Sequence, residues 1–423
     1  MIYVGIVIVT LTAVAIVRRY EVRLVLFTSG FLMCLLSANP LRAIAAFQST
    51  IVHGTFVPII TTVMGFAFVL KLTQCDVHLV NALAKPMKVL NKGLIPATVA
   101  VTFVVNIFIP SAAGTAAAVG AIMIPLLIAS GVHPAIAACA VLTGTFGGMM
   151  NPGNAHAVMV AGIANVDVME VVFRIAPLVI ISALIGAVTL TIIAFMRKEH
   201  TGYLPEKPED TLVEESVSEF KVNPIKVLVP IAPLVLLIIG SAQLGIFATP
   251  ITVPQAMIGG IVLAGLATLT NPQEVSNAFF NGMGSAFGQV IGIIASATVF
   301  TTGLELIGLT PALIRAMQES EALVRIAAPF GPMLFTVLAG SGDAVSMAFN
   351  NAVTPHAAQF GLDKISLGNI VALAGALGRS ASPVGGAGII CAALAKVNPI
   401  ELTKRNILGM LLATTFLMIT LMI

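Results

Sequence analysis

A single arginine, Arg379, lies inside an otherwise apolar stretch, in the segment AGALGRSASPVGG that runs from Ala374 to Gly386. Small residues precede this arginine and a run of Ser, Pro and Gly follows it, so a helix cannot continue smoothly past it. A charge at membrane depth costs at least ~2.5 kcal/mol on insertion scales. The segment therefore predicts a broken transmembrane helix whose guanidinium binds an anion. The alternative is an arginine at a helix end whose side chain reaches the membrane surface.

Three further ionisable residues lie near such interruptions. Asp343, in the turn Gly340-Ser341-Gly342-Asp343, is the one acid that we predict at membrane depth. It has three possible roles: pairing with Arg379, binding a coupling cation, or carrying a proton. His156 and His356 are candidates for the coupling ion, although a packed or interfacial histidine is the simpler interpretation of each.

Four glycine-, serine- and proline-rich interruptions divide long apolar stretches, at residues 110–115, 144–154, 340–343 and 378–386. We interpret the first and third as tips of re-entrant hairpins and the other two as breaks within helices. Helices that stop inside a membrane direct their N-terminal N–H groups toward anions. Since a lone Ser or Thr usually bonds its own helix, the grouping of polar residues at the interruptions carries the prediction. This group comprises Ser111, Thr115, Thr145, Asn151, Asn154, Ser341, Ser380 and Ser382.

The composition places the chain among polytopic membrane proteins. It is 58% hydrophobic and 9% charged, with a mean hydropathy of +1.05. Its basic residues form no patch, so a nucleic-acid partner is not expected. The sequence has no P-loop, zinc-protease or nucleophile-elbow motif, and its four cysteines form no CxxC pair. We therefore expect neither an enzyme nor a metal or cofactor, apart from coupling to H⁺ or Na⁺.

The apolar segments predict an all-α fold of two inverted repeats, each with about five transmembrane helices, a re-entrant hairpin and a broken helix. An offset of 231 residues pairs Gly144 with Gly375, Gly147 with Gly378, Pro152 with Pro383, Glu170 with Glu401 and Arg174 with Arg405. The first repeat spans residues 1–196, with scaffold spans in 1–93 and the hairpin and broken helix in 94–196. A polar linker, 197–223, precedes the second repeat, 224–423, with scaffold spans in 224–323 and the hairpin and broken helix in 324–423.

The predicted segments of the first half are 2–17, 24–38, 55–70, an amphipathic helix at 77–90, the hairpin 94–129, the broken helix 135–163 and 171–196. Those of the second half are 224–240, 253–269, 287–303, an amphipathic helix at 311–323, the hairpin 327–358, the broken helix 365–395 and 402–423.

Positive charge predicts the orientation. Of the 21 lysines and arginines, Arg379 is internal, five lie on one side of this arrangement and fifteen on the other. The positive-inside rule then directs both termini to the periplasmic side of a bacterial inner membrane and the linker to the cytoplasm.

Residues near the C-terminus resemble those of a known family. The turn Gly340–Asp343, the run Leu377–Val384 and the segment Ala395–Glu401 with Lys404-Arg405 are similar to the C-terminal signature of the DcuC-type anaerobic C4-dicarboxylate carriers, in the ion transporter superfamily. The close similarity covers roughly the last 85 residues, and the hydropathy order agrees over the whole chain. One departure is Asp343, where the family pattern has an amide.

The resemblance implies a secondary carrier of succinate, fumarate, malate or aspartate, often an exchanger, that is usually dimeric and moves a transport domain against a scaffold. It assigns Ser341, Gly342, Asp343, Arg379, Ser380, Ser382 and Pro383 to the substrate region. The competing interpretations are a transporter or exporter of another small organic or inorganic anion or of an amino acid, and a channel.

Overall fold

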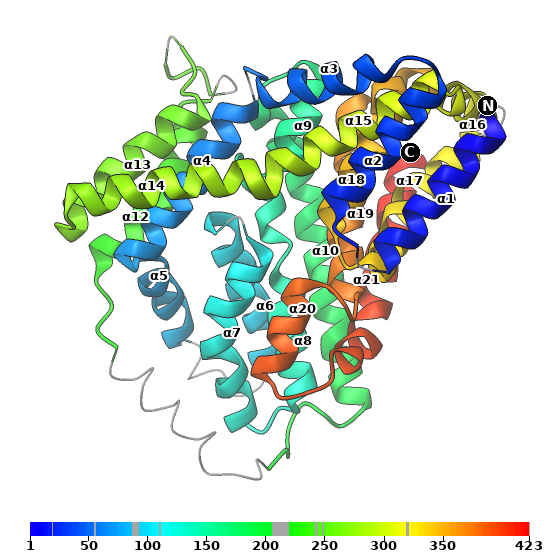
Figure 1. The fold of residues 1–423 in the computed structure, drawn as a ribbon. Coiled ribbons are helices and arrows are strands. Elements are labelled where there is room, and N and C mark those ends of the chain that lie inside the picture. Colours follow the sequence, from blue (N-terminus) through cyan, green and yellow to red (C-terminus); the bar gives the residue numbers. More distant parts are fainter. Residues whose placement is uncertain are drawn as a thin grey trace.

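The computed structural model describes residues 1–18, 20–54, 56–86, 93–109, 111–204, 220–241, 244–247, 249–318 and 321–422, and the regular elements among them are all helical (Figure 1). The first half comprises α1 (Ile2–Val17), α2 (Val22–Leu36), α3 (Pro40–Ile51), α4 (Phe56–Thr73), α5 (Cys75–Ala84), α6 (Leu94–Phe108), α7 (Ala112–Ala129), α8 (Pro134–Gly144), α9 (Ala155–Ala164) and α10 (Val168–Met196). A 3-10 helix, Gly147–Met150, lies between α8 and α9.

The second half is also helical. It comprises α12 (Pro224–Ile239), α13 (Val253–Thr268), α14 (Pro272–Ala286), a π-helical segment (Phe287–Ile291), α15 (Gly292–Leu306), α16 (Leu309–Gln318), α17 (Glu321–Ala339) and α18 (Gly342–Val353). A 3-10 helix (Thr354–Phe360), α19 (Lys364–Ala381), α20 (Gly386–Leu394) and α21 (Pro399–Met422) complete the chain.

Both expected hairpins and both expected helix breaks have counterparts in the structure. The chain turns between α6 and α7 and between α17 and α18, and it is interrupted between α8 and α9 and between α19 and α20. A bend of 74° separates α4 from α5, so these two helices form a broken or re-entrant pair. Residue 110 of the first hairpin tip, residues 87–90 of the amphipathic helix at 77–90 and residues 205–219 of the linker lie outside the described residues.

Two helices, α3 and α14, are absent from the segments predicted from sequence. Each begins with a proline after an asparagine, Asn39-Pro40 and Asn271-Pro272, which suits the first turn of a helix. Helix α14 carries Gln273, Glu274 and several Asn, Ser and Gly residues, so its hydropathy falls below that of a span. The prediction at 287–303 was therefore too short at its start, because the helical path already begins at Pro272.

Two interrupted helices form the centre of the molecule. All eleven residues of α8 are buried, and so are nearly all residues of α19. Alanine and glycine dominate both helices, which allows neighbouring backbones to approach closely. Helices α6 and α7 pack on α8, α17 and α18 pack on α19, and the long helices α10 and α21 pack against each other beside them.

A second group of helices packs beside this centre. Helix α15 packs against α2 and α3, and α4 packs against α13 and α14. Helix α12 lies against α13 and α5, while α1 lies against α2. The two groups meet where α4 contacts α9 and where α15 contacts α18.

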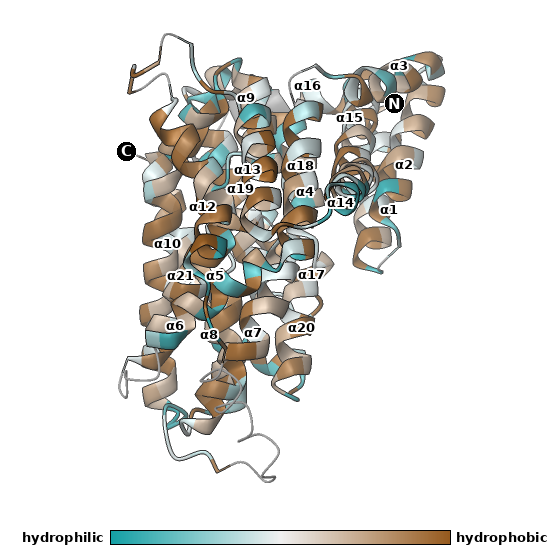
Figure 2. Cartoon of the chain, turned by 90° about the vertical axis from the view of Figure 1, so that its left-hand side faces the viewer, coloured by the Kyte–Doolittle hydropathy of each residue, from teal (hydrophilic) through white to brown (hydrophobic). Residues whose placement is uncertain are grey.

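Outward faces of the long helices are apolar. On α10, Leu184, Val188 and Ile192 recur every four residues and are all exposed, so they form one stripe along the helix. Among the described residues, four helical stretches are long and apolar enough to cross a membrane, namely Ala112–Ala129, Val168–Met196, Pro272–Leu306 and Pro399–Met422, and the bent pair α4–α5 brings this to five. Figure 2 shows the hydrophobic colour extending over most of these helices. This is the surface expected of helices that face lipid.

Backbone conformation recurs between the halves. Ala38 and Leu269 follow α2 and α13 with φ of 56° and 52°, and Asn165 and Lys396 follow α9 and α20 with φ of 57° and 54°. Non-glycine residues rarely adopt this left-handed conformation. Both pairs are separated by 231 residues, the offset found in the sequence.

Candidate functional site

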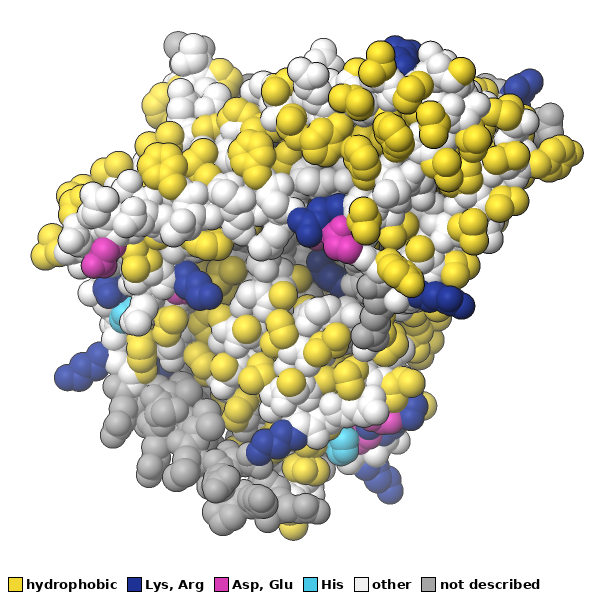
Figure 3. All heavy atoms as spheres, viewed as in Figure 1, with side chains coloured by type: hydrophobic (Ala, Val, Ile, Leu, Met, Phe, Trp, Pro, Cys, Tyr) yellow, Lys and Arg dark blue, Asp and Glu magenta, His cyan; other side chains and the backbone are white. Residues whose placement is uncertain are grey.

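A cavity of about 490 Å³ lies where the two hairpin tips and the two helix breaks meet α2, α4 and the π-helical segment. Figure 3 shows a hollow at the centre of one face, with charged side chains of both signs at its rim. The volume suits a small molecule. Of the predicted site residues, its wall includes Ser111, Thr145, Asn154, His156, Ser341, Asp343 and Arg379.

Besides α2, four helices of the described chain begin at this cavity, one at each hairpin tip and one after each helix break. The first residues of α7, α9 and α20 line its wall, as does Asp343 in the first turn of α18. The aligned peptide dipoles give each helix N-terminus roughly half a positive charge. Four such ends around one space make it attractive to anions.

Polar caps fix where two of these helices start. The Ser111 hydroxyl oxygen accepts a hydrogen bond from the Gly114 amide over 3.1 Å, and Asn154 Oδ1 accepts from the His156 amide over 2.9 Å. These are ordinary N-cap contacts, and they end the extended segment before each helix. Asn154 also donates from Nδ2 to the Gly148 carbonyl oxygen over 2.9 Å, which ties the start of α9 to the 3-10 helix.

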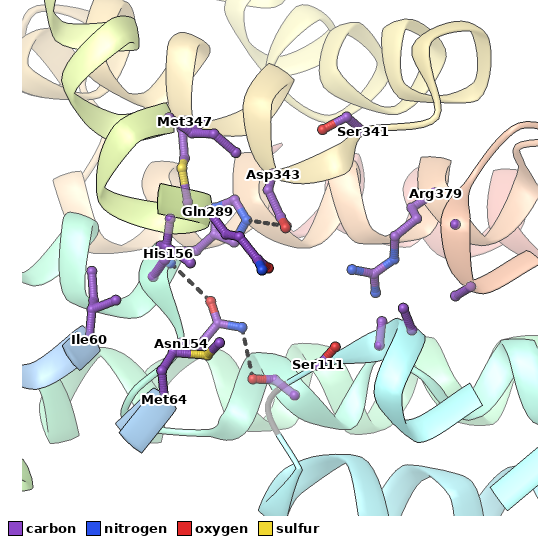
Figure 4. Close-up of a pocket in the computed structure, with 18 of the residues that line it drawn as sticks. Ile60, Met64, Ser111, Asn154, His156, Gln289, Ser341, Asp343, Met347 and Arg379 are labelled. Atoms are coloured by element: carbon purple, nitrogen blue, oxygen red, sulfur yellow. Dashed lines mark hydrogen bonds and ion pairs between the residues drawn. The ribbon is translucent and has the colours of Figure 1, made fainter. Parts of the chain in front are cut away.

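Arg379 lies in the last turn of α19, and its side chain points into the cavity (Figure 4). Nη2 donates to the carbonyl oxygen of Thr145, the residue that ends α8, over 3.0 Å. Nε is buried and has no hydrogen-bond partner among the described residues. The guanidinium is thus anchored at one nitrogen and keeps donors available for a ligand.

His156 and Asp343 form a pair across the cavity wall. Their atoms Nε2 and Oδ1 are 3.0 Å apart and join α9 to α18 (Figure 4). The His156 side chain is only 5% exposed, whereas that of Asp343 is 58% exposed. The buried imidazole therefore holds one carboxylate oxygen while the rest of the carboxylate faces the cavity.

The profile of one protein family, DcuC, described as C4-dicarboxylate anaerobic carrier, matches residues 2–423. The chain belongs to the DcuC family. The resemblance drawn from the C-terminal motifs is therefore confirmed and extends over nearly the whole sequence. This DcuC-family chain is a multi-pass membrane transporter and not an enzyme.

Two relatives illustrate how far this similarity reaches. A Haemophilus influenzae protein described only as a transporter is 42% identical over 277 residues, which cover 64% of this chain and 98% of that protein. The anaerobic C4-dicarboxylate transporter DcuC of Escherichia coli K12 is 24% identical over 95% of this chain and 92% of its own length.

The fold of the DcuC-family chain resembles that of a solved transporter. The crystal structure of the Alcanivorax borkumensis YdaH transporter superposes with a TM-score of 0.54 at 14% sequence identity, over 90% of this chain and 88% of that one. The shared feature is the fold, an all-helical, multi-span architecture.

Several residues predicted for the site lie beside the cavity rather than on its wall. The hydroxyls of Thr115, Ser380 and Ser382 donate to the carbonyl oxygens of Ile109, Ala376 and Val337. Gly342 packs so closely on α19 that a Cβ would lie 2.6 Å from the Gly375 carbonyl oxygen. The remaining three, Asn151, Pro383 and His356, are also absent from the wall, and His356 lies in the 3-10 helix after α18.

Four polar or charged wall residues of this DcuC-family chain were not predicted from the sequence. Asn106 accepts from the Gly148 amide and donates to Thr115, so it connects the first hairpin to the first break. Gln289 reaches the cavity from the π-helical segment, and Glu21 and Arg23 reach it from the start of α2. An isolated amide in an apolar run was the available signal for Asn106.

Metal binding has no support among the residues that the structure describes, which contain no group of three His, Cys, Asp or Glu side chains able to hold an ion. The four cysteines are buried and free.

Proposed function

We propose that this protein is a secondary active transporter of C4-dicarboxylates such as succinate, fumarate, malate or aspartate, acting as an antiporter or ion-coupled symporter by alternating access. The observation that carries the proposal is the meeting of four helix N-termini and Arg379 at one cavity. The name of the E. coli relative supplies the substrate class.

The guanidinium would bind one carboxylate of the substrate, because a planar fork of N–H donors suits a carboxylate in both charge and shape. Ser111 and Ser341, one at each hairpin tip, lie on the cavity wall and could hydrogen-bond the rest of the molecule. These residues, with Thr145 and Asn154, form the proposed site. A second layer of residues packs outside the cavity wall and supports the site, namely Ser380, Ser382, Pro383, Gly342, Thr115 and Asn151.

Two inverted repeats are part of this proposal, and the packing supports them. Helices exchange partners across the halves, because α15 packs on α2 and α3 as α4 packs on α13 and α14. Within each half the packing also matches, because α17 packs on α19 as α6 packs on α8. Such an exchange is the mark of a pseudo-two-fold relation between halves. The left-handed residues at an offset of 231 support the same relation.

One departure from this symmetry supports alternating access. Helix α18 of the second hairpin packs against α15, whereas α7 has no comparable packing against α4 within the described parts of the chain. We interpret this as a state in which the second hairpin is closed against α15 of a scaffold of residues 1–93 and 224–323, while the first hairpin contacts this scaffold through α5 and α12 and stays open toward α4. The transport domain would comprise residues 94–196 and 324–423, with 197–223 as a cytoplasmic linker.

The proposal also includes a membrane orientation, a homodimer and a coupling ion. The excess of Lys and Arg on one side of the predicted topology supports a bacterial inner membrane with both termini periplasmic. A homodimer follows from the resemblance to the family. For a coupling ion, the contact between His156 and Asp343 favours this pair over His356, which lies apart from the cavity wall.

The test is uptake of labelled succinate and fumarate into proteoliposomes by the full chain and by Arg379→Ala and Arg379→Lys. We expect loss of uptake in the alanine variant and a raised apparent KM in the lysine variant. Arg174→Lys, at an arginine that does not line the cavity, serves as the control. Retained uptake with unchanged affinity in both Arg379 variants would remove this residue from the site, and continuous conductance without saturable counterflow would favour a channel.

A further inference from the structure

Two opposite charges face the same cavity without neutralising each other. Arg379 and Asp343 both point into the space between them (Figure 4). Arg379 donates its hydrogen bond to Thr145, and the carboxylate of Asp343 contacts Nε2 of His156. No ion pair joins Arg379 to Asp343, although the structure describes both residues.

An unsubstituted dicarboxylate fits this arrangement incompletely. Arg379 and the helix N-termini could bind its two carboxylates. Such a molecule has no positively charged group to pair with the Asp343 carboxylate. Like charges close together in a partly dehydrated space repel, so a substrate carboxylate beside Asp343 costs free energy. An ammonium group on the substrate would replace this repulsion by attraction.

The position of Asp343 also suits this role. His156 holds Oδ1, and the side chain keeps most of its exposure toward the cavity, so the carboxylate is oriented and still accessible. The other charged groups on the wall are Glu21 and Arg23, which pair with each other where α2 begins. Asp343 is therefore the acid that the hairpin tips and helix breaks present to a ligand.

We propose that Asp343 is a specificity-determining residue, which makes the cavity prefer a dicarboxylate that bears an α-ammonium group over the same dicarboxylate without one. This inference rests on the proposed function, because it requires that the cavity bind the substrate. In the bound state the ammonium contacts Asp343, one carboxylate contacts Arg379, and the second carboxylate lies among the helix N-termini.

L-Aspartate and L-malate form the matched pair of probes, because they differ only in an ammonium and a hydroxyl group. Binding of each to the purified full chain is measured by ligand-induced thermal stabilisation and by competition against labelled aspartate at pH 7. We expect the wild type to bind aspartate at least tenfold more tightly than malate. Asp343→Asn should bring this ratio close to one, by weakening aspartate and strengthening malate.

Two further variants keep the test decisive. Asp343→Glu retains the charge and should retain a preference for aspartate, which separates loss of charge from loss of folding. Asp167→Asn changes an acid that caps α10 away from the cavity, and it should leave the ratio unchanged.

A wild-type ratio of one or less, or a ratio that Asp343→Asn does not alter, overturns the inference and leaves the proposed transport of dicarboxylates standing. If neither aspartate nor malate binds in a manner that depends on Arg379, both the inference and the proposed function are overturned.

Discussion

Arg379 donates a hydrogen bond to the carbonyl oxygen of Thr145 over 3.0 Å, and these residues are 234 positions apart in the chain. The contact connects the end of α19 to the end of α8, so the interruption of one helix is held against that of the other. A guanidinium fixed in this way loses little conformational freedom when it binds a carboxylate.

Asn106 should be required to hold the first hairpin against the first break. Its Oδ1 accepts from the Gly148 amide over 2.5 Å, and its Nδ2 donates to Ile109 and Thr115, each over 3.0 Å. Asn106→Ala leaves the Gly148 N–H buried without a partner, at a cost of about 1–3 kcal/mol. The measurement is the thermal unfolding midpoint in detergent together with substrate uptake.

Asn106→Asp separates positioning from charge. It keeps the acceptor for Gly148 but adds a negative charge to the cavity wall, so affinity for an anionic substrate should fall. Asn351→Ala, which removes an amide held by one 3.5 Å contact to Thr298, is the control and should change stability little. Unchanged stability and affinity in both Asn106 variants would show that this residue does not support the site.

Close packing at Gly147 and Gly378 should not tolerate a methyl group. A Cβ at Gly147 would lie 2.0 Å from the Phe103 carbonyl oxygen, and one at Gly378 would lie 2.3 Å from that of Met333. Each contact presses the first helix of a hairpin onto the adjacent break. Alanine at either position must displace backbone, which typically costs about 1–3 kcal/mol.

The matched control for these glycines is Gly162, where a Cβ meets nothing within 4 Å. Gly162→Ala lies inside α9 and should stabilise the protein, by up to about 1 kcal/mol. Chemical denaturation of the three variants under the same conditions tests whether Gly162→Ala is the most stable of them. Equal stability of all three would mean that the hairpins do not pack tightly on the breaks.

Arg405 should be the most important charged residue for stability. Its side chain is 4% exposed, and it donates to Glu199 over 2.8 Å and to Glu401 over 2.7 Å. Arg405→Ala removes the partner of two acids, and breaking a buried pair costs about 3–5 kcal/mol. Lys404→Ala, which breaks a more exposed pair with Glu401, should change stability far less, because solvent screens this pair.

The same ion pair predicts a dependence on pH. Burial raises the pKa of Glu199, which follows the end of α10, but hydrogen bonds and the charge of Arg405 outweigh burial and hold the pKa below its usual range. A pKa lowered by folding adds stability above the unfolded value of about 4.3, and this stability is lost as pH falls through the lower folded value. The stability gap between wild type and Glu199→Gln should therefore stay constant from pH 7 to about 5 and close as pH falls further, through the unfolded value and then the lower folded value. A gap that widened on acidification would contradict this assignment.

Local sequence predicts the interruptions well, because Gly, Pro and Ser act on the backbone within a few residues. The turn at Gly340 and the break after Arg379 could be located for this reason. Helix α14 could not be located from the sequence, because its composition is too polar for a predicted span. Its burial comes from packing on α4.

The cavity wall was harder to predict than the breaks. Ser380 and Ser382 flank Arg379 in sequence, yet helical geometry directs their hydroxyls to Ala376 and Val337 instead of the cavity. Gln289 reaches the wall only because a π-helical turn interrupts α14 and α15, and no local pattern specifies which side chain such a turn presents. The pair of His156 and Asp343 spans 187 residues, so it depends on how the halves pack.

The four helix ends at the cavity have a consequence for how this carrier could evolve. Their attraction for negative charge comes from the main chain, which has no proton to lose and no side chain to mutate. A change at a single wall residue would thus alter which anion the cavity prefers, while the helix ends continue to attract anions. Selectivity could then drift among related carriers without passing through an inactive intermediate.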